Sequence, residues 1–153
     1  MITCSPIQPG KMQAPLAKVL LVEDSKFLRL ATERALARAG YDVTTAADGE
    51  QALQLARQKL PDVILLDLLL PKITGTDVLK ALKADPATRA IPVVILSGMS
   101  GKNAERLRKD GAFAFLGKTD LALEKGSAAL LQAMSDILQK LHVEVPVTPL
   151  AAK

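Results

Sequence analysis

The chain has 153 residues, of which 49% are hydrophobic and 24% charged, and its formal net charge is +4. This length predicts one domain with a single core, and this composition excludes a disordered chain. One cysteine, Cys4, and one histidine, His142, exclude a disulfide framework, a multi-cysteine metal site and His-rich catalytic centres. Aromatic residues make up only 3% of the chain, so base-stacking surfaces for nucleic acid are not expected despite the basic charge.

The two ends of the chain contain five of its nine prolines. Proline fixes φ and removes a hydrogen-bond donor, so we expect flexible tails over residues 1–16 and 142–153 around one domain at 17–141. The apolar runs are far shorter than the ~20 residues that a membrane-spanning helix needs. No signal peptide is recognised, and we therefore expect a cytoplasmic protein without membrane insertion.

Short apolar runs alternate with helical patterns along the middle of the chain. The runs cover residues 18–22, 41–45, 62–66, 92–96 and 112–116. The helical patterns between them end near Gly40, Pro61, Pro86 and Gly111, and a last one runs from Leu130 to Leu141. Strands this apolar on both faces suit a parallel sheet with helices on each side. The sequence predicts an α/β, flavodoxin-like doubly wound (βα)5 fold with strand order 2-1-3-4-5.

Polar residues follow four of the five apolar runs directly or closely. Glu23 and Asp24 follow the first run, Asp67 the third, Ser97 the fourth, and Lys118 comes after the fifth. In this fold the carboxyl ends of the strands share one edge, which is where ligands bind. Two unit charges ~5 Å apart repel by about 3 kcal/mol at an effective dielectric near 20. Three converging carboxylates therefore need a bound cation, or some of them must stay protonated. An all-oxygen site favours Mg²⁺.

Sites of phosphoryl transfer typically gather a carboxylate, a divalent metal, a lysine and a hydroxyl around one point. An aspartate in such a site can act as the nucleophile. Acids after strands also serve as N-caps of the next helix, and this alternative stays open for Asp24.

Four segments carry a recognisable combination of motifs: residues 19–25, residues 64–71 with Gly75, residues 94–98 and residues 111–118. Together they resemble the receiver domain of response regulators in two-component signalling. The resemblance spans about residues 17–141. It implies that Asp67 accepts a phosphoryl group from a histidine kinase or a histidine phosphotransfer protein. It also implies Mg²⁺ ligation by Asp24, Asp67 and the main-chain carbonyl of Leu69, with Glu23 acting mainly through water.

The resemblance further implies that Lys118 and Ser97 bind phosphoryl oxygens. Phe115 is then the switch aromatic that turns inward when Ser97 moves, although a purely structural core role is an equal alternative for this ring. Such domains signal through the face formed by the helix near 101–110, the strand at 112–116 and the last helix. On that face they bind a downstream protein target or a second copy of the chain.

The loops around this site depart from the family pattern. Thr119 stands where the family has a proline after a cis peptide bond, and a non-proline cis bond costs ~3–4 kcal/mol, so we predict a trans Lys118–Thr119 bond and a rearranged loop. Gly98 and Met99 follow Ser97, and the resemblance implies that they lie in the loop bordering phosphoryl access, with Leu69 and Met99 beside the path of the hydrolytic water. Because Leu69 and Met99 are apolar and cannot orient water, we predict slow autodephosphorylation.

The predicted function is therefore a self-phosphorylating aspartate acceptor rather than a turnover enzyme. A P-loop is excluded because five residues, not four, separate Gly111 from Gly117-Lys118-Thr119. The alternative is a receiver-like binding module that works without phosphorylation.

Partner binding has one candidate surface in the first predicted helix. Its basic residues are Lys26, Arg29, Arg34 and Arg38. They would suit an acidic phosphotransfer partner, and an ordinary solvated helix face is the alternative. Direct nucleic-acid binding is not expected.

Overall fold

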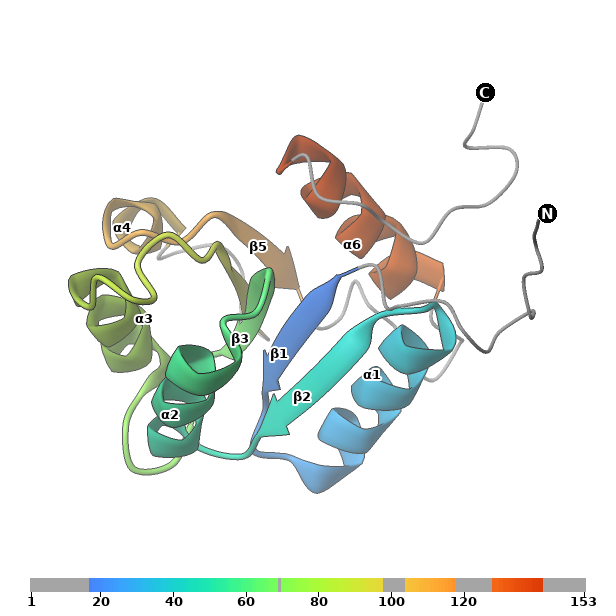
Figure 1. Cartoon of the computed structure of the whole chain (residues 1–153), viewed down its shortest axis with the longest axis horizontal. Helices are drawn as coiled ribbons and strands as arrows, with labels where there is room; N and C mark the ends of the chain where they lie inside the picture. Colours follow the sequence, from blue (N-terminus) through green and yellow to red (C-terminus); the bar gives the residue numbers. More distant parts are fainter. Residues whose placement is uncertain (1–16, 69, 98–103, 118–127, 142–153) are drawn as a thin grey trace, which may run out of the picture.

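The computed structural model describes residues 17–68, 70–97, 104–117 and 128–141, and the predicted tails lie outside these ranges. Its elements are β1 (Lys18–Val22), α1 (Lys26–Arg38), β2 (Asp42–Ala46), α2 (Gly49–Lys59), β3 (Val63–Asp67), α3 (Gly75–Ala84), β4 (Val93–Ser97), α4 (Ala104–Lys109), β5 (Ala114–Gly117) and α6 (Ala128–Lys140). The five strands form one parallel sheet in the order β2-β1-β3-β4-β5 (Figure 1). The predicted fold class and strand order are confirmed.

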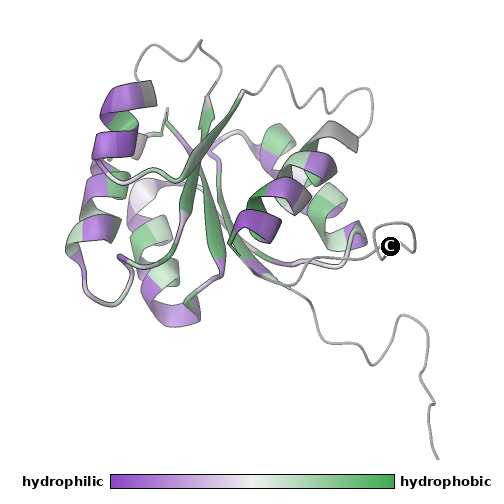
Figure 2. Cartoon of the chain, turned by 90° about the horizontal axis from the view of Figure 1, so that it is seen from above, coloured by the Kyte–Doolittle hydropathy of each residue, from purple (hydrophilic) through white to green (hydrophobic). Residues whose placement is uncertain are grey.

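Helices cover both faces of this sheet, and the strands form an apolar layer between them (Figure 2). Along β1 and β3 the side chains alternate between two cores. Leu20 and Ile64 pack with α2, α3 and α4, whereas Leu21 and Leu65 pack with α1 and α6. This alternation follows from the two-residue period of a strand. Within the described ranges, no helix has both the length and the apolar character needed to cross a membrane.

Three helices begin with a side chain that caps the first turn. Ser25, Asp48 and Thr74 accept hydrogen bonds from the main-chain N–H groups of Leu28, Gln51 and Asp77. Each cap satisfies a donor that has no partner inside its helix. Capping fixes where each of these helices begins, and the predicted acids Glu23 and Asp24 lie in the turn just before the cap of α1.

The observed strands begin one or two residues later than predicted, except β1. Tyr41 donates its main-chain N–H to Leu36 at the end of α1, and Ala112 donates to Leu107 at the end of α4, so both residues belong to helix termini. Pro92 has no N–H for the ladder, although its carbonyl accepts from Ile64. The ends of the preceding helices therefore set where β2 and β5 begin, and the missing N–H of Pro92 sets where β4 begins.

Candidate functional site

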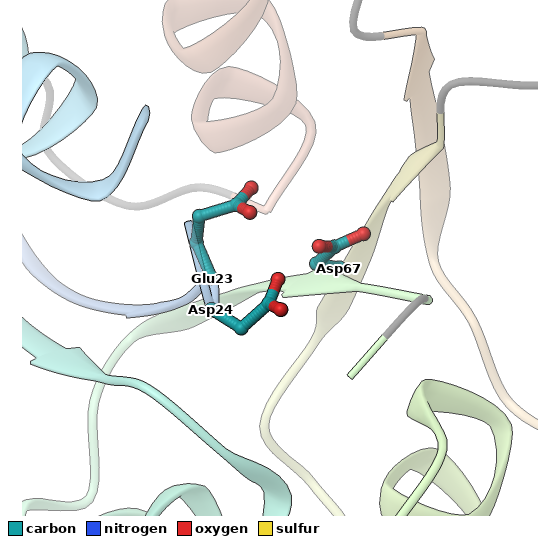
Figure 3. Close-up of side chains that lie close together, drawn as sticks. All are labelled: Glu23, Asp24 and Asp67. Carbon is teal, nitrogen blue, oxygen red and sulfur yellow. The ribbon is translucent and has the colours of Figure 1, made fainter. Parts of the chain in front are cut away.

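Three carboxylates meet at the carboxyl end of the sheet. Glu23, Asp24 and Asp67 each offer an oxygen atom, and these atoms all lie within 4.8 Å of one another. Glu23 and Asp67 are buried, with 3% and 2% of their surface exposed, whereas Asp24 is exposed. Figure 3 shows the three side chains gathered at the ends of β1 and β3. The structure thus brings together the three acids that the sequence predicted to converge.

The turn between β1 and α1 positions Glu23 and Asp24. The main-chain N–H of Glu23 still donates to Ala46 of β2, at 3.0 Å. The main-chain N–H of Ser25 donates to Oε2 of Glu23 at 3.2 Å, and Ser25 caps α1. The alternative role of Asp24 as the N-cap is therefore wrong, because Ser25 occupies the cap position and leaves the Asp24 carboxylate at the cluster.

Asp67 is the last residue of β3, the central strand. Its main chain is in register with Leu96 of β4, and the N–H of Leu68 donates to the carbonyl of Leu96 at 3.4 Å. All five residues of β3 are buried. The acid therefore comes at the end of a fully buried strand that pairs with β1 on one side and with β4 on the other.

Gly75 packs directly under this acid. A Cβ atom at position 75 would lie 2.5 Å from the carbonyl oxygen of Asp67 and 2.5 Å from Cα of Leu68. The main-chain N–H of Gly75 also donates to the carbonyl of Leu68 at 2.9 Å. Only glycine allows the start of α3 to approach the end of β3 this closely. The sequence pattern includes Gly75, but it gives no role for the residue.

The remaining predicted site residues are only partly described. Ser97 ends β4 and is in register with Gly117 of β5, so its main chain lies at the same edge of the sheet, and its side chain is not described. Five other predicted positions lie outside the described residues: Leu69, Gly98, Met99, Lys118 and Thr119. Their predicted roles, including the trans Lys118–Thr119 bond, stay predictions.

Phe115 lies on β5 and is half-buried against the core formed with α2, α3 and α4. The guanidinium carbon of Arg108, on α4, lies 5.3 Å from the centre of its ring. This distance is within the range of a cation–π contact. The ring is thus bounded by the core on one side and by an exposed charged residue on the other. This position is compatible with either alternative, a switch or a core residue.

The basic residues of α1 divide into two groups. Lys26, Arg34 and Arg38 are exposed, whereas Arg29 is half-buried and donates to main-chain carbonyls of the β1–α1 turn. Two large apolar residues of the same helix are exposed, Phe27 at 78% and Leu30 at 38%. On sequence alone Arg29 groups with the solvent-facing bases of this helix, and nothing there singles out Phe27. No periodicity signal distinguishes an arginine that turns back onto its own loop.

The three-carboxylate cluster fits a divalent cation. Mg²⁺ in proteins takes oxygen ligands, usually one or two carboxylates, with water and substrate oxygens completing its shell. Glu23, Asp24 and Asp67 provide this set, and two of the three are withdrawn from bulk solvent. At an effective dielectric near 20, the repulsion between such charges is about 3 kcal/mol for each pair, which a bound cation would offset.

Comparisons with known proteins agree with this geometry. Residues 19–125 match the family described as the response regulator receiver domain. The gliding motility regulatory protein of Myxococcus xanthus is 44% identical over 117 residues, which cover 73% of this chain but only 15% of that protein. This chain therefore corresponds to a small part of that longer relative.

Two of the similar solved structures illustrate the shared fold. The chemotaxis response regulator CheY4 of Vibrio cholerae has a TM-score of 0.71 and 32% identity, over 80% of this chain and 99% of that chain. The receiver domain of the sensor histidine kinase PA1611 of Pseudomonas aeruginosa has a TM-score of 0.66 and 26% identity, over 80% and 95%. That structure holds a magnesium ion in its active-site cleft. The fold, the acid cluster and the family match lead to one conclusion: the chain belongs to the response regulator receiver domains of two-component signalling.

Proposed function

We propose that this receiver accepts a phosphoryl group on Asp67 from a phosphohistidine donor and changes its protein contacts in response. The observation that carries the proposal is the buried Asp67 carboxylate, held within 4.8 Å of Glu23 and Asp24 at the carboxyl edge of the sheet. Asp67 is the member of the cluster that ends the central strand, and it is buried, with 2% of its surface exposed.

In the proposed step, an oxygen atom of the Asp67 carboxylate attacks the phosphorus atom of the donor. The O–P bond forms as the P–N bond to the histidine breaks, and the imidazole leaves with the electron pair of that bond and takes a proton from water. Mg²⁺, when bound, would neutralise the oxygens of the acids and of the phosphoryl group. Asp24, Asp67 and the carbonyl of Leu69 are the proposed ligands, with Glu23 acting mainly through water.

The product of this step would carry about two negative charges and three strong acceptors. We assign Lys118 and Ser97 to these phosphoryl oxygens, since Ser97 ends β4 and Lys118 follows the last residue of β5 in the sequence. Phe115 is the proposed switch residue of the face formed by α4, β5 and α6. That face would contact a downstream protein target or a second copy of the chain.

The donor must reach Asp67, so its docking surface has to border the acid cluster. Helix α1 begins two residues after Asp24 and exposes Phe27 near its start, followed by Leu30. Exposed Lys26 and Arg34 flank this apolar pair. An apolar centre with a basic rim suits a helical donor with an acidic edge. Substitution of Phe27 by alanine is expected to slow transfer from a protein donor and to leave phosphorylation by acetyl phosphate unchanged.

Two apolar residues, Leu69 and Met99, would border the path of the hydrolytic water. Because apolar side chains cannot orient a water molecule, they would prolong the lifetime of the phosphorylated state. We propose that autodephosphorylation is slow and that the domain does not turn over. The Leu69→Asn and Met99→Glu variants are then expected to lose the phosphoryl group faster than the wild type. Equal decay rates would contradict this part of the proposal.

The central test is incubation of the full chain with acetyl phosphate and Mg²⁺, followed by intact-mass measurement. The wild type should gain the mass of one phosphoryl group, Asp67→Asn should not, and the control Asp42→Asn should. Asp42 is an exposed acid at the amino end of β2, the opposite edge of the sheet. No mass gain by the wild type, together with no binding of beryllofluoride, would favour the alternative, a receiver-like binding module that works without phosphorylation.

A further inference from the structure

Arg29 lies one turn into α1, and its side chain reaches back over the turn that carries the two neighbouring acids. Its Nη1 donates to the main-chain carbonyl of Glu23 at 2.9 Å and to that of Asp24 at 3.3 Å. Its own main-chain N–H donates to the carbonyl of Ser25 at 2.8 Å. One residue therefore binds three successive carbonyls of the turn between β1 and α1.

These bonds restrain Asp24 in particular. The carbonyl of Glu23 belongs to the peptide plane before the Asp24 Cα, and the carbonyl of Asp24 belongs to the plane after it. Because peptide units are planar, fixing both planes fixes φ and ψ of Asp24. Glu23 and Asp67 are held by burial, but Asp24 is exposed. Its carboxylate direction therefore depends on its backbone more than on packing.

We propose that Arg29 is a positioning residue for the metal site, holding the backbone of Asp24 so that its carboxylate faces Asp67 before a cation arrives. This inference rests on the proposed Mg²⁺ role of the cluster. The bonds use main-chain carbonyls, so they take up no carboxylate oxygen. The positive charge of the guanidinium acts in the opposite direction, since it repels an incoming cation. Substitution of Arg29 should therefore weaken Mg²⁺ binding if its positioning role dominates, and strengthen it if only its charge matters.

The test is calorimetric titration of the full chain with Mg²⁺. Arg29→Met removes the charge and both side-chain bonds, whereas the control Arg34→Met removes an equal charge from the same helix at an exposed position. Partners that orient metal ligands typically contribute 10–100-fold to affinity, so Arg29→Met should bind Mg²⁺ about 10-fold more weakly than Arg34→Met. Equal or tighter binding by Arg29→Met would overturn the inference and leave only the effect of charge.

A second variant keeps the test decisive if Arg29→Met does not fold. Arg29→Lys retains the charge on a side chain with a different reach and a single donor nitrogen. Its Mg²⁺ affinity should fall several-fold below that of the wild type, and wild-type affinity would overturn the inference. Circular dichroism and thermal unfolding in EDTA verify that each variant is folded. If the wild type itself binds no Mg²⁺, the proposed function fails, which is a different result from equal binding by wild type and variants.

Discussion

Acidic residues occur in two kinds of environment in this domain. Glu23, Asp24 and Asp67 are gathered with one another at the carboxyl edge of the sheet, within 4.8 Å, and two of them are buried. On the surface near α2 and α3, by contrast, acids are paired with bases. Asp85 lies 2.7 Å from Nε of Arg57, and Asp48 lies 3.6 Å from Nζ of Lys72.

The difference separates acids that hardly change the free energy of unfolding from acids that lower it when no metal is bound. A surface pair neutralises itself and is screened by solvent, so little is gained or lost when it is changed. A buried group of like charges raises the free energy of the metal-free domain, because the charges repel at low dielectric. Such a cluster is maintained only by a scaffold that holds the acids in place, and the following predictions test that scaffold and its ligand.

The largest effect is expected from Gly75→Ala. The new Cβ would lie 2.5 Å from the backbone of Asp67 and Leu68, and backbone atoms at the end of a central strand cannot move away. We expect a loss of about 1–3 kcal/mol of unfolding free energy together with weaker Mg²⁺ binding. Denaturant unfolding and calorimetry measure both quantities.

Gly49→Ala is the matched control, because Gly49 is likewise the first residue of its helix, α2. There the nearest atom to the new Cβ would be a side-chain methyl group of Val78, at 2.6 Å, which can shift more easily than backbone. Equal losses in both variants, or full Mg²⁺ affinity in Gly75→Ala, would show that the close approach to Asp67 does not hold the cluster.

Added Mg²⁺ should distinguish the two kinds of acid directly. A ligand at a hundredfold excess over its Kd stabilises the folded state by about 2.7 kcal/mol, so the melting temperature of the wild type should rise with Mg²⁺. Asp24→Asn should remove most of this rise, whereas Asp85→Asn should keep all of it. Thermal unfolding at several Mg²⁺ concentrations provides the measurement, and an equal rise in all three proteins would place the cation elsewhere.

The free energy of unfolding should depend on pH differently in the wild type and in the Asp85→Asn variant. The hydrogen bond from Arg57 lowers the pKa of Asp85 below its ordinary value of 3.8, and the main-chain N–H of Ala87 adds to this effect. A lowered pKa contributes stability above pH 3.8, and that contribution is lost as the pH falls through the folded-state pKa. Asp85→Asn should therefore be less stable than the wild type at neutral pH, and the two should converge in strong acid. Urea unfolding over this pH range is the measurement, and a constant difference would contradict the assignment.

The smallest effect is expected from Lys72→Met. Its ammonium group lies 3.6 Å from Asp48 and 3.8 Å from Glu50, and its side chain is 59% exposed. Long, solvated ion pairs of this kind contribute little, so urea unfolding should detect no more than a minor loss that disappears at high salt. A loss larger than that of Gly75→Ala would remove the contrast between the surface pairs and the buried cluster.

Much of the fold and the acid cluster could be predicted from the sequence because both follow from simple periodicities. Apolar runs on both faces indicate parallel strands, and Asp67 directly follows such a run, so the topology alone brings it near Glu23 and Asp24. The contact of Arg29 could not be predicted, since it depends on one long side chain turning back onto its own loop. The close approach at Gly75 likewise depends on how α3 meets β3 in space, and no sequence pattern indicates it.

The alternation of side chains along β3 has a consequence for how the acceptor is held. Val63 and Leu65 pack into one core, Ile64 and Leu66 pack into the other, and Asp67 comes next. A slip of the strand by one residue would exchange every side chain between the two cores at once. The packing of both cores therefore opposes any shift of β3 along its axis. Asp67 can be displaced along the strand only if the packing on both faces of the sheet is disrupted at the same time.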